Sequence, residues 1–262
     1  MKNRYSSLES AEWQKEKDLP IDGMYRGFYP IYDALLEHVQ PHVKNACEIG
    51  IGYAQCHVVW NIIFEPETNV IGLDIGSPIT KHEGNQGRRL RNEINTVGLD
   101  TYIQFPMKFT RGLNLHWNKD GYDPEVVQEA VDAYGKFDWV VNDALQRGEA
   151  FKMMTPWKDA ITETGIIFQE KIGREPESKI NQQRMQQALD EGWLIYDVRQ
   201  YTDLDTDALA GNADAEGYIG IWSNNQDNII EMLKEYEHLR LKDTSHIDPS
   251  IHSNAFRETP WD

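Results

Sequence analysis

The sequence has few cysteines, few basic side chains for its acidic content, and no long apolar run. Its two cysteines, Cys47 and Cys56, are too few for a disulfide framework or a zinc cluster, so a reducing cytoplasmic setting is expected. No apolar stretch reaches the length of a transmembrane helix. Residues 1–22 are polar and lack an apolar signal-peptide core, so neither membrane association nor export is predicted.

Positive charge is also scarce, because 26 basic residues face 43 acidic ones, a net charge of −17. A surface of this sign repels phosphate backbones, so nucleic acid is not favoured as a partner. The only dense basic group is Arg88, Arg89 and Arg91, which is read as a solvated helix face. A small-molecule substrate is the expected partner.

Hydrophobic residues make up 40% of the 262-residue chain, enough for the core of one large α/β domain. Apolar β-branched runs alternate with helical patterns along most of its length. Strands are expected from Asn45 into a glycine loop and at 69–74, 102–105, 137–143, 165–170, 193–201 and 217–222. Helices are expected at 23–40, 55–64, 84–97, 124–134, 149–163 and 178–191.

This alternation predicts an α/β fold with a doubly wound, seven-stranded, mainly parallel sheet and helices on both faces. No helix separates the last two strands, so they can pair antiparallel, with an antiparallel last strand, and this final hairpin would add an antiparallel edge strand to the sheet. Residues 1–22 form a polar tail or cap and 23–226 the domain. Residues 227–262 carry an amphipathic helix at 227–242, which docks on the domain or on a second subunit of a homo-oligomer, and a tail.

The most informative stretch is Cys47-Glu-Ile-Gly-Ile-Gly-Tyr-Ala-Gln, followed by Asp74 at the end of the next strand. A nucleotide-like ligand binds where such a strand ends and a helix begins. Gly50 and Gly52 let the backbone turn tightly and approach the ligand, since no Cβ intervenes. Asp74 can accept both hydroxyls of a ribose. The alternative is a tight turn followed by an exposed strand-end aspartate.

Two residues distinguish this loop from the loop of a dinucleotide-binding site. The dinucleotide motif requires a third glycine, and Gln55 stands there. Glu48, just before the first glycine, would repel a pyrophosphate but suits the cationic end of S-adenosylmethionine. An NAD-dependent oxidoreductase is therefore disfavoured.

Glu48-Ile-Gly-Ile-Gly, Leu73-Asp74 and the closing antiparallel strands together resemble class I (Rossmann-like) S-adenosylmethionine-dependent methyltransferases over residues 25–223. The runs Tyr32-Asp-Ala-Leu-Leu, Val59-Trp60 and Val70-Ile-Gly-Leu-Asp-Ile are further similar to the macrocin and mycinamicin sugar O-methyltransferases and the cephalosporin-hydroxylase group. The resemblance implies S-adenosylmethionine as cofactor. It implies cofactor contacts at Glu48, Gly50, Gly52, Asp74, Ile75 and Asn142.

The narrower group's catalytic motif is kept only in part. Asp143 matches its magnesium ligand, but Gln146 stands where its general-base histidine would be, and an amide cannot take a proton. Glu170-Lys171 stands in place of a Glu-Asp pair of metal ligands. Asp143 and Glu170 thus form a half-site for Mg²⁺. Lys171 could replace the metal by pairing with these carboxylates or, if desolvated, act as the base. An ordinary ion pair among strand-end residues is the alternative.

Two further groups have alternative interpretations. His116, expected in a loop after the third strand, is either a substitute base or a histidine bonded to local carbonyls. Tyr25, Phe28, Tyr29 and Tyr32 could form a lid over the pocket, but the helical spacing of the three tyrosines favours the core.

These features predict an enzyme that methylates an oxygen of a small polar metabolite or sugar, with Asp143, Lys171 and His116 as catalytic candidates. The missing base and metal ligand motivate an alternative. In that reading, the chain is an S-adenosylmethionine-binding or interaction protein that keeps the frame without the chemistry.

Overall fold

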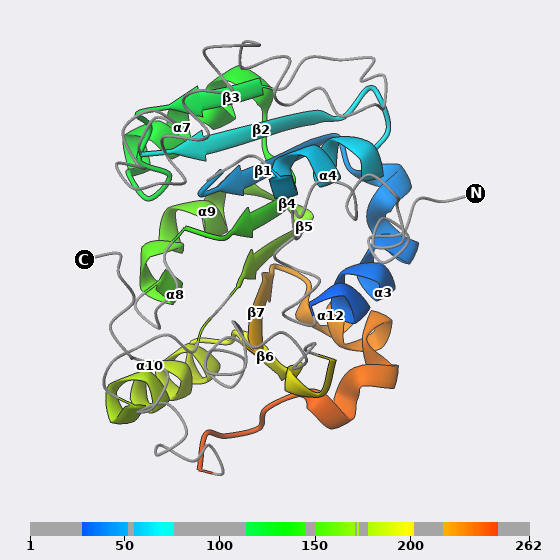
Figure 1. Ribbon diagram of the computed structural model, residues 1–262, viewed down its shortest axis with the longest axis vertical. Helices are drawn as coiled ribbons and strands as arrows, with labels where there is room; N and C mark the ends of the chain where they lie inside the picture. Colours follow the sequence, from blue (N-terminus) through cyan, green and yellow to red (C-terminus); the bar gives the residue numbers. More distant parts are fainter. Residues whose placement is uncertain are drawn as a thin grey trace, which may run out of the picture.

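The computed structural model describes residues 28–51, 55–75, 114–144, 150–170, 172, 178–201 and 217–245. Within these residues, seven strands form one sheet in the order β3-β2-β1-β4-β5-β7-β6 (Figure 1). The strands are β1 (Asn45–Ile49), β2 (Asn69–Asp74), β3 (Asn114–Trp117), β4 (Phe137–Asn142), β5 (Ile161–Gln169), β6 (Leu194–Asp197) and β7 (Tyr218–Ser223). The predicted tail 1–22, strand 102–105 and helix 84–97 lie outside the described residues.

The first five strands pair in parallel, and β7 runs antiparallel to both of its neighbours, β5 and β6. The predicted fold class is therefore confirmed, with an antiparallel last strand and a final antiparallel hairpin at the edge of the sheet. β7 lies inside the sheet and β6 forms the edge. The physical reason is burial, because Tyr218, Ile219 and Ile221 are fully buried and need cover on both faces.

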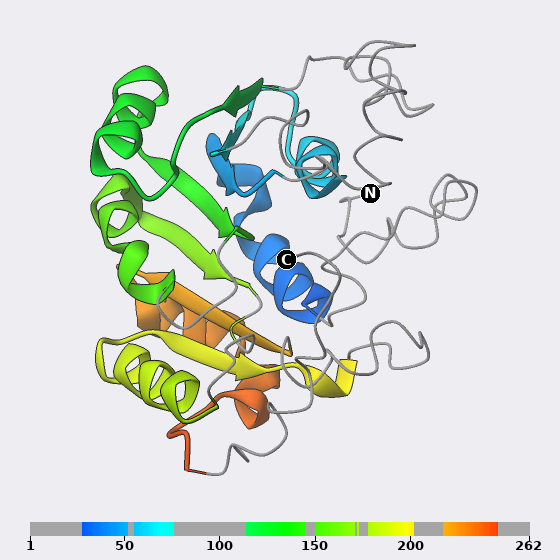
Figure 2. The same ribbon diagram turned by 60° about the vertical axis from the view of Figure 1, so that its left-hand side comes forward.

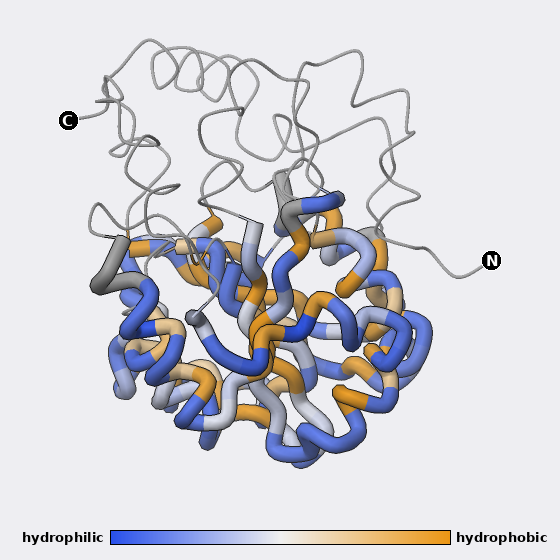
Figure 3. Tube along the Cα trace, turned by 90° about the horizontal axis from the view of Figure 1, so that it is seen from below, coloured by the Kyte–Doolittle hydropathy of each residue, from blue (hydrophilic) through white to orange (hydrophobic). Residues whose placement is uncertain are grey.

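Helices cover both faces of the sheet (Figures 1 and 2). One face, called here the α3 face, carries α3 (Tyr29–Val39), α4 (Gln55–Ile63) and α12 (Gln226–Met232). The other, the α7 face, carries α7 (Pro124–Tyr134), α8 (Ala150–Met153), α9 (Thr155–Ala160) and α10 (Ser178–Asp190). Figure 3 shows apolar positions gathered in the interior, with polar positions on the outer helices.

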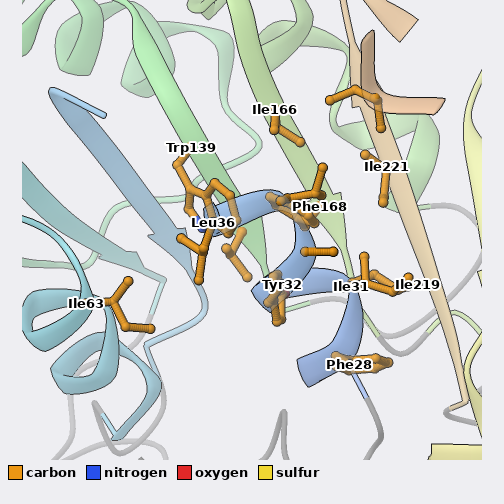
Figure 4. Packing of buried hydrophobic residues seen from close by; sticks show 14 of the residues in the cluster. Phe28, Ile31, Tyr32, Leu36, Ile63, Trp139, Ile166, Phe168, Ile219 and Ile221 are labelled. Carbon is orange, nitrogen blue, oxygen red and sulfur yellow. The ribbon is translucent and has the colours of Figure 1, made fainter. Parts of the chain in front are cut away.

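The core of the α3 face is aromatic. The ring of Tyr32 packs against Trp60, Trp139 and Phe168, with centroids 5.1, 5.8 and 5.0 Å away. Figure 4 shows Tyr32 among the apolar side chains of the central strands. Tyr32 and Phe28 are both fully buried, so the expectation of a core position is confirmed for Tyr32, and Phe28 also lies in the core rather than in a lid.

The helix α7 begins and ends where the sequence predicts. The Asp123 side chain accepts a hydrogen bond from the Glu125 N–H, and Pro124 fits the first turn because it needs no N–H partner there. Gly135 ends the helix with φ of +85° and ψ of −176°, a backbone conformation that essentially only glycine adopts.

Several elements differ from the prediction in their position or bounds, among them α3, which begins at Tyr29, and β6, which ends at Asp197. Residues 114–117 form β3 where a loop was expected, because a half-exposed four-residue edge strand carries too short an alternation to be recognised. The helix predicted at 149–163 ends at Ala160, since the β-branched Ile161 starts β5 by pairing with Phe137. Gly165 accommodates the irregular pairing there, because a Cβ would lie 2.7 Å from the Phe137 carbonyl oxygen.

The predicted helix 227–242 is also interrupted. It consists of α12 and the 3₁₀ helix η4 (Lys234–Leu239), and Ile229, Leu233 and Leu239 dock on the α3-face core. The chain then crosses the free edge of β6, where Arg240 bridges Tyr196 and the Leu241 N–H donates to the Ile195 carbonyl at 2.8 Å. This contact covers an edge that would otherwise invite pairing. In the part of the chain that the structure describes, no helix could span a membrane.

Candidate functional site

The strand order reverses between β1 and β4, and the carboxyl ends of these strands mark the place where open α/β sheets bind ligands. Gly50 follows β1 with φ of +87°, and its N–H donates to the Leu73 carbonyl at 2.8 Å. A Cβ on Gly50 would lie 2.6 Å from the Ala144 backbone. Glycine is thus required because two backbone segments meet at this switch point, whatever the loop binds. Gly52 lies outside the described residues.

Carboxylates stand at the ends of the four parallel strands nearest this point. Glu48 lies in β1, Asp74 ends β2, Asp143 follows β4 and Glu170 follows β5. Glu48, Asp74 and Glu170 are 1–3% exposed, and Asp143 is half-buried. Among the residues in the structure's described ranges, no three His, Cys, Asp or Glu side chains form a group that could hold a metal ion. The carboxylates are spread along the sheet edge.

Glu48 points to the α3 face, where its Oε2 lies 3.3 Å from His57 Nδ1 in the first turn of α4. The sequence interpretation missed His57, since a lone histidine in an apolar helix gives no sign of its partner. Gly72 leaves space for the ring, because a Cβ there would lie 3.1 Å from His57 Nδ1. Burial, and secondarily the charge of Glu48, raises the pKa of the neighbouring Cys47 thiol, which stays protonated and unreactive.

Asp74 is buried at the carboxyl end of β2, and its backbone carbonyl accepts the Lys119 N–H at 2.9 Å. Ile75 follows with 65% of its surface exposed. A buried carboxylate and an exposed apolar side chain therefore stand side by side at this strand end. Both were predicted as cofactor contacts.

Asn142, another predicted cofactor contact, is fully buried and bonded within the protein. Its Oδ1 accepts from the Tyr122 hydroxyl at 2.9 Å and from the Ala144 N–H at 3.2 Å. Its Nδ2 donates to Gln169 Oε1 at 2.5 Å. The side chain thus ties β4 to β5 and to the segment before α7.

The side chain of Glu170 is held by a residue of α3, since the Tyr32 hydroxyl donates a hydrogen bond to Glu170 Oε1. The Glu170 N–H donates to the Asn142 carbonyl at 3.1 Å, which aligns the ends of β4 and β5. The two predicted metal ligands, Asp143 and Glu170, therefore lie at adjacent strand ends, and one Glu170 oxygen already has a protein donor. Lys171 and Gln146 lie outside the described residues.

His116 lies in β3, so its expected position in a loop is wrong. Its register partner Leu73 packs in the α7-face core, and His116 Nε2 lies 3.2 Å from the Tyr134 hydroxyl oxygen. Asn114 Nδ2 donates to the same hydroxyl at 2.8 Å. The structure thus places His116 on the face opposite Glu48 and does not bring it together with Glu170.

No protein-family model and no curated protein matches this sequence. Solved structures similar to it include the MycE methyltransferase of the mycinamycin biosynthetic pathway, in complex with Mg, SAH and mycinamycin VI. The match to MycE has a TM-score of 0.42 and 15% sequence identity, and it covers 85% of this chain and 49% of MycE. This chain therefore spans about half the length of MycE. The O-methyltransferase TomG from Streptomyces achromogenes, in complex with SAM, has a TM-score of 0.41 and 12% identity over 84% of this chain and 89% of its own. An O-methyltransferase from Bacillus cereus, in complex with SAH, has a TM-score of 0.41 and 14% identity over 82% and 90%.

Proposed function

We propose that this protein is an S-adenosylmethionine-dependent methyltransferase. The observation that carries the proposal is the pair of buried carboxylates, Glu48 and Asp74, that flank the turn at Gly50 at the switch point. A row of carboxylates favours a cationic ligand and repels the pyrophosphate of a dinucleotide. The antiparallel β7 inside the sheet agrees with the methyltransferase class that the sequence resembles.

The residues present suit this cofactor. Asp74 would accept hydrogen bonds from the ribose hydroxyls, and the exposed Ile75 would pack against the adenine. Glu48 would attract the ammonium of the amino-acid end. Gly52 remains a proposed contact. When bound, the cofactor supplies an electrophilic methyl group on a sulfonium. The protein's part is to hold that methyl group in line with the acceptor oxygen, which lowers the entropic share of the barrier.

We further propose that the acceptor is a hydroxyl of a small polar metabolite or sugar. Asp143 and Glu170 support this, because carboxylates at the ends of β4 and β5 can accept hydrogen bonds from acceptor hydroxyls. The same two residues are the proposed ligands of Mg²⁺, which takes one or two protein carboxylates in many sites. Lys171 is the proposed base or charge partner, and unchanged turnover in Lys171→Met would exclude both roles.

Calorimetric titration with S-adenosylhomocysteine tests the cofactor, with and without Mg²⁺ and with NADH as control. One-to-one binding of S-adenosylhomocysteine is expected, with NADH giving no heat. Tighter binding with Mg²⁺ would support a metal at Asp143 and Glu170. Absence of S-adenosylhomocysteine binding in both conditions would overturn the proposal, and NADH binding alone would favour an oxidoreductase.

A second candidate, an S-adenosylmethionine-binding protein without methyl transfer, is motivated by the amide of Gln146 in the position of the base. The distinguishing measurement is release of S-adenosylhomocysteine during incubation with a panel of sugars and phenols. Binding of the cofactor without release of S-adenosylhomocysteine in the presence of any acceptor would favour this second candidate.

A further inference from the structure

A buried pair of titratable side chains spans the glycine loop. Glu48 lies two residues before Gly50, and His57 lies in the first turn of the helix that follows the loop. The Glu48 Oε2 and His57 Nδ1 atoms are 3.3 Å apart, and the two side chains are 1% and 0% exposed. The pair therefore joins the two sides of the loop at a depth where solvent does not screen their interaction.

The neighbouring strand is shaped around this pair. Gly72 is the register partner of Glu48 in β2. A Cβ on Gly72 would lie 3.1 Å from His57 Nδ1 and 2.9 Å from the Ile51 side chain. Glycine weakens a strand interior, so its presence here indicates that the space above β2 is needed by the side chains of Ile51 and His57.

The chemistry of the pair assigns it an orienting role. A carboxylate in an apolar interior needs hydrogen-bond donors or an opposite charge to stay ionised and in one orientation. An imidazole N–H supplies such a donor and, when the ring is protonated, the charge as well. Because His57 belongs to α4, the position of Glu48 is linked to the helix that follows the loop.

We propose that His57 is a positioning residue of the cofactor site, which holds the Glu48 carboxylate in the orientation that meets the ammonium end of S-adenosylmethionine. The inference rests on the proposed function. It assigns His57 no contact with the cofactor. It predicts that loss of His57 weakens recognition of the amino-acid end and spares the adenosine end, which the proposed function assigns to Asp74 and Ile75 on another strand.

Two probes separate these ends. S-adenosylhomocysteine carries the amino-acid end, and methylthioadenosine keeps the adenosine and thioether but lacks it. Calorimetry with both probes on wild type, His57→Leu, His57→Asn and Glu48→Gln is the test. His57→Leu should bind S-adenosylhomocysteine about tenfold more weakly, because the buried Glu48 carboxylate loses its polar neighbour 3.3 Å away, with methylthioadenosine unchanged within about twofold.

His57→Asn is the matched rescue variant, because its amide N–H₂ lies near the position of the imidazole Nδ1. It should regain most of the affinity, while Glu48→Gln should reproduce the selective loss. Equal weakening of both probes in His57→Leu, or no weakening of either, would overturn the inference. If His57→Leu does not fold, the comparison is made between His57→Asn and Glu48→Gln. Binding of S-adenosylhomocysteine by His57→Asn that is no tighter than by Glu48→Gln would also overturn the inference. Failure of the proposed function gives a different result, since wild type would then bind neither probe.

Discussion

At the amino ends of the parallel strands, called here the amino edge, Asp138 binds two backbone N–H groups and a hydroxyl, whereas at their carboxyl ends, the carboxyl edge, Glu48 and Glu170 meet side chains from the helices. Asp138 Oδ2 in β4 accepts from the Lys44 and Asn45 N–H groups at 2.8 and 3.1 Å, and its Oδ1 accepts from the Thr162 hydroxyl at 2.9 Å. At the carboxyl edge, Glu48 lies against His57, and Glu170 accepts from Tyr32.

This difference separates stability from binding. The Asp138 carboxylate is committed to three donors, in Lys44 just before β1, in Asn45 of β1 and in Thr162 of β5, so it fixes the sheet and offers little to a ligand. The carboxyl-edge acids are placed by tyrosine and histidine side chains at a switch point, where a ligand can compete for or share their oxygens. Substitution of Asp138 should therefore lower stability alone, whereas substitution of a carboxyl-edge acid that meets the ligand should mainly lower affinity.

The largest effect is expected for Gly50→Ala, where both properties depend on one residue. The left-handed backbone and the 2.6 Å approach to Ala144 should together cost roughly 3 kcal/mol or more of unfolding free energy and abolish binding of S-adenosylhomocysteine. Gly135→Ala is the matched control, since Gly135 has φ of +85° but a Cβ would meet only Asn45 Nδ2 at 3.6 Å. It should cost about 1–3 kcal/mol, because its backbone conformation suits glycine alone, and should spare binding. Urea unfolding measures the stability of both variants, and calorimetry measures their binding. Equal losses of unfolding free energy in the two variants would argue against the backbone contact at Gly50.

Asp138→Ala should be the next largest, and should affect stability alone. Removing the acceptor of two N–H groups and one hydroxyl should cost about 2–3 kcal/mol in urea unfolding. Thr162→Val, which removes one donor, should cost about 1 kcal/mol. The affinity for S-adenosylhomocysteine should stay within about twofold, and a large loss would break the distinction between the two edges.

Asp74→Asn should give the reverse pattern. Replacing a carboxylate that accepts ribose hydroxyls should weaken binding of S-adenosylhomocysteine about tenfold, while unfolding free energy changes by less than about 1 kcal/mol. Calorimetry and urea unfolding on the same preparation provide the check. A stability loss as large as that of Asp138→Ala would mean that Asp74 serves the fold.

Tyr32→Phe should lower stability by about 1–2 kcal/mol, because the buried Glu170 carboxylate loses a donor while the aromatic packing stays intact. Tyr201→Phe is the control, as this half-buried ring packs edge-on against Tyr29 and Tyr236. It should change the unfolding free energy by less than about 0.5 kcal/mol. Similar values for the two variants would contradict the Tyr32–Glu170 interaction.

The smallest effect is expected at Glu237, on the surface outside both edges. Hydrogen bonds from Arg240 and Lys242 lower its pKa from 4.5 to about 2. A lowered pKa stabilises the fold above pH 4.5, and this contribution disappears as the pH falls toward 2. Glu237→Gln should therefore cost less than about 1 kcal/mol at pH 7 and almost nothing near pH 2. A cost in urea unfolding that grows at low pH would contradict this assignment.

The sequence predicted much of the fold from local patterns. The bounds of α7 follow from Asp123, Pro124 and Gly135, which act within one turn of the chain. The strand at β3 was missed because four half-exposed residues gain their strand conformation from pairing with β2. The break in the C-terminal helix was missed because the α3-face core and the edge of β6 compete for its last residues.

For the site, the sequence by itself determined the glycine turn and the acidic strand ends, because Glu48, Gly50 and Asp74 are tied to strand positions that apolar periodicity reveals. Only the tertiary structure decided what holds those carboxylates. Tyr32 is 138 residues from Glu170 in the chain, and His57 reaches Glu48 only after α4 packs over Gly72. Such pairs depend on strand order and on which helix covers which face, and non-local packing, rather than local propensity, determines both.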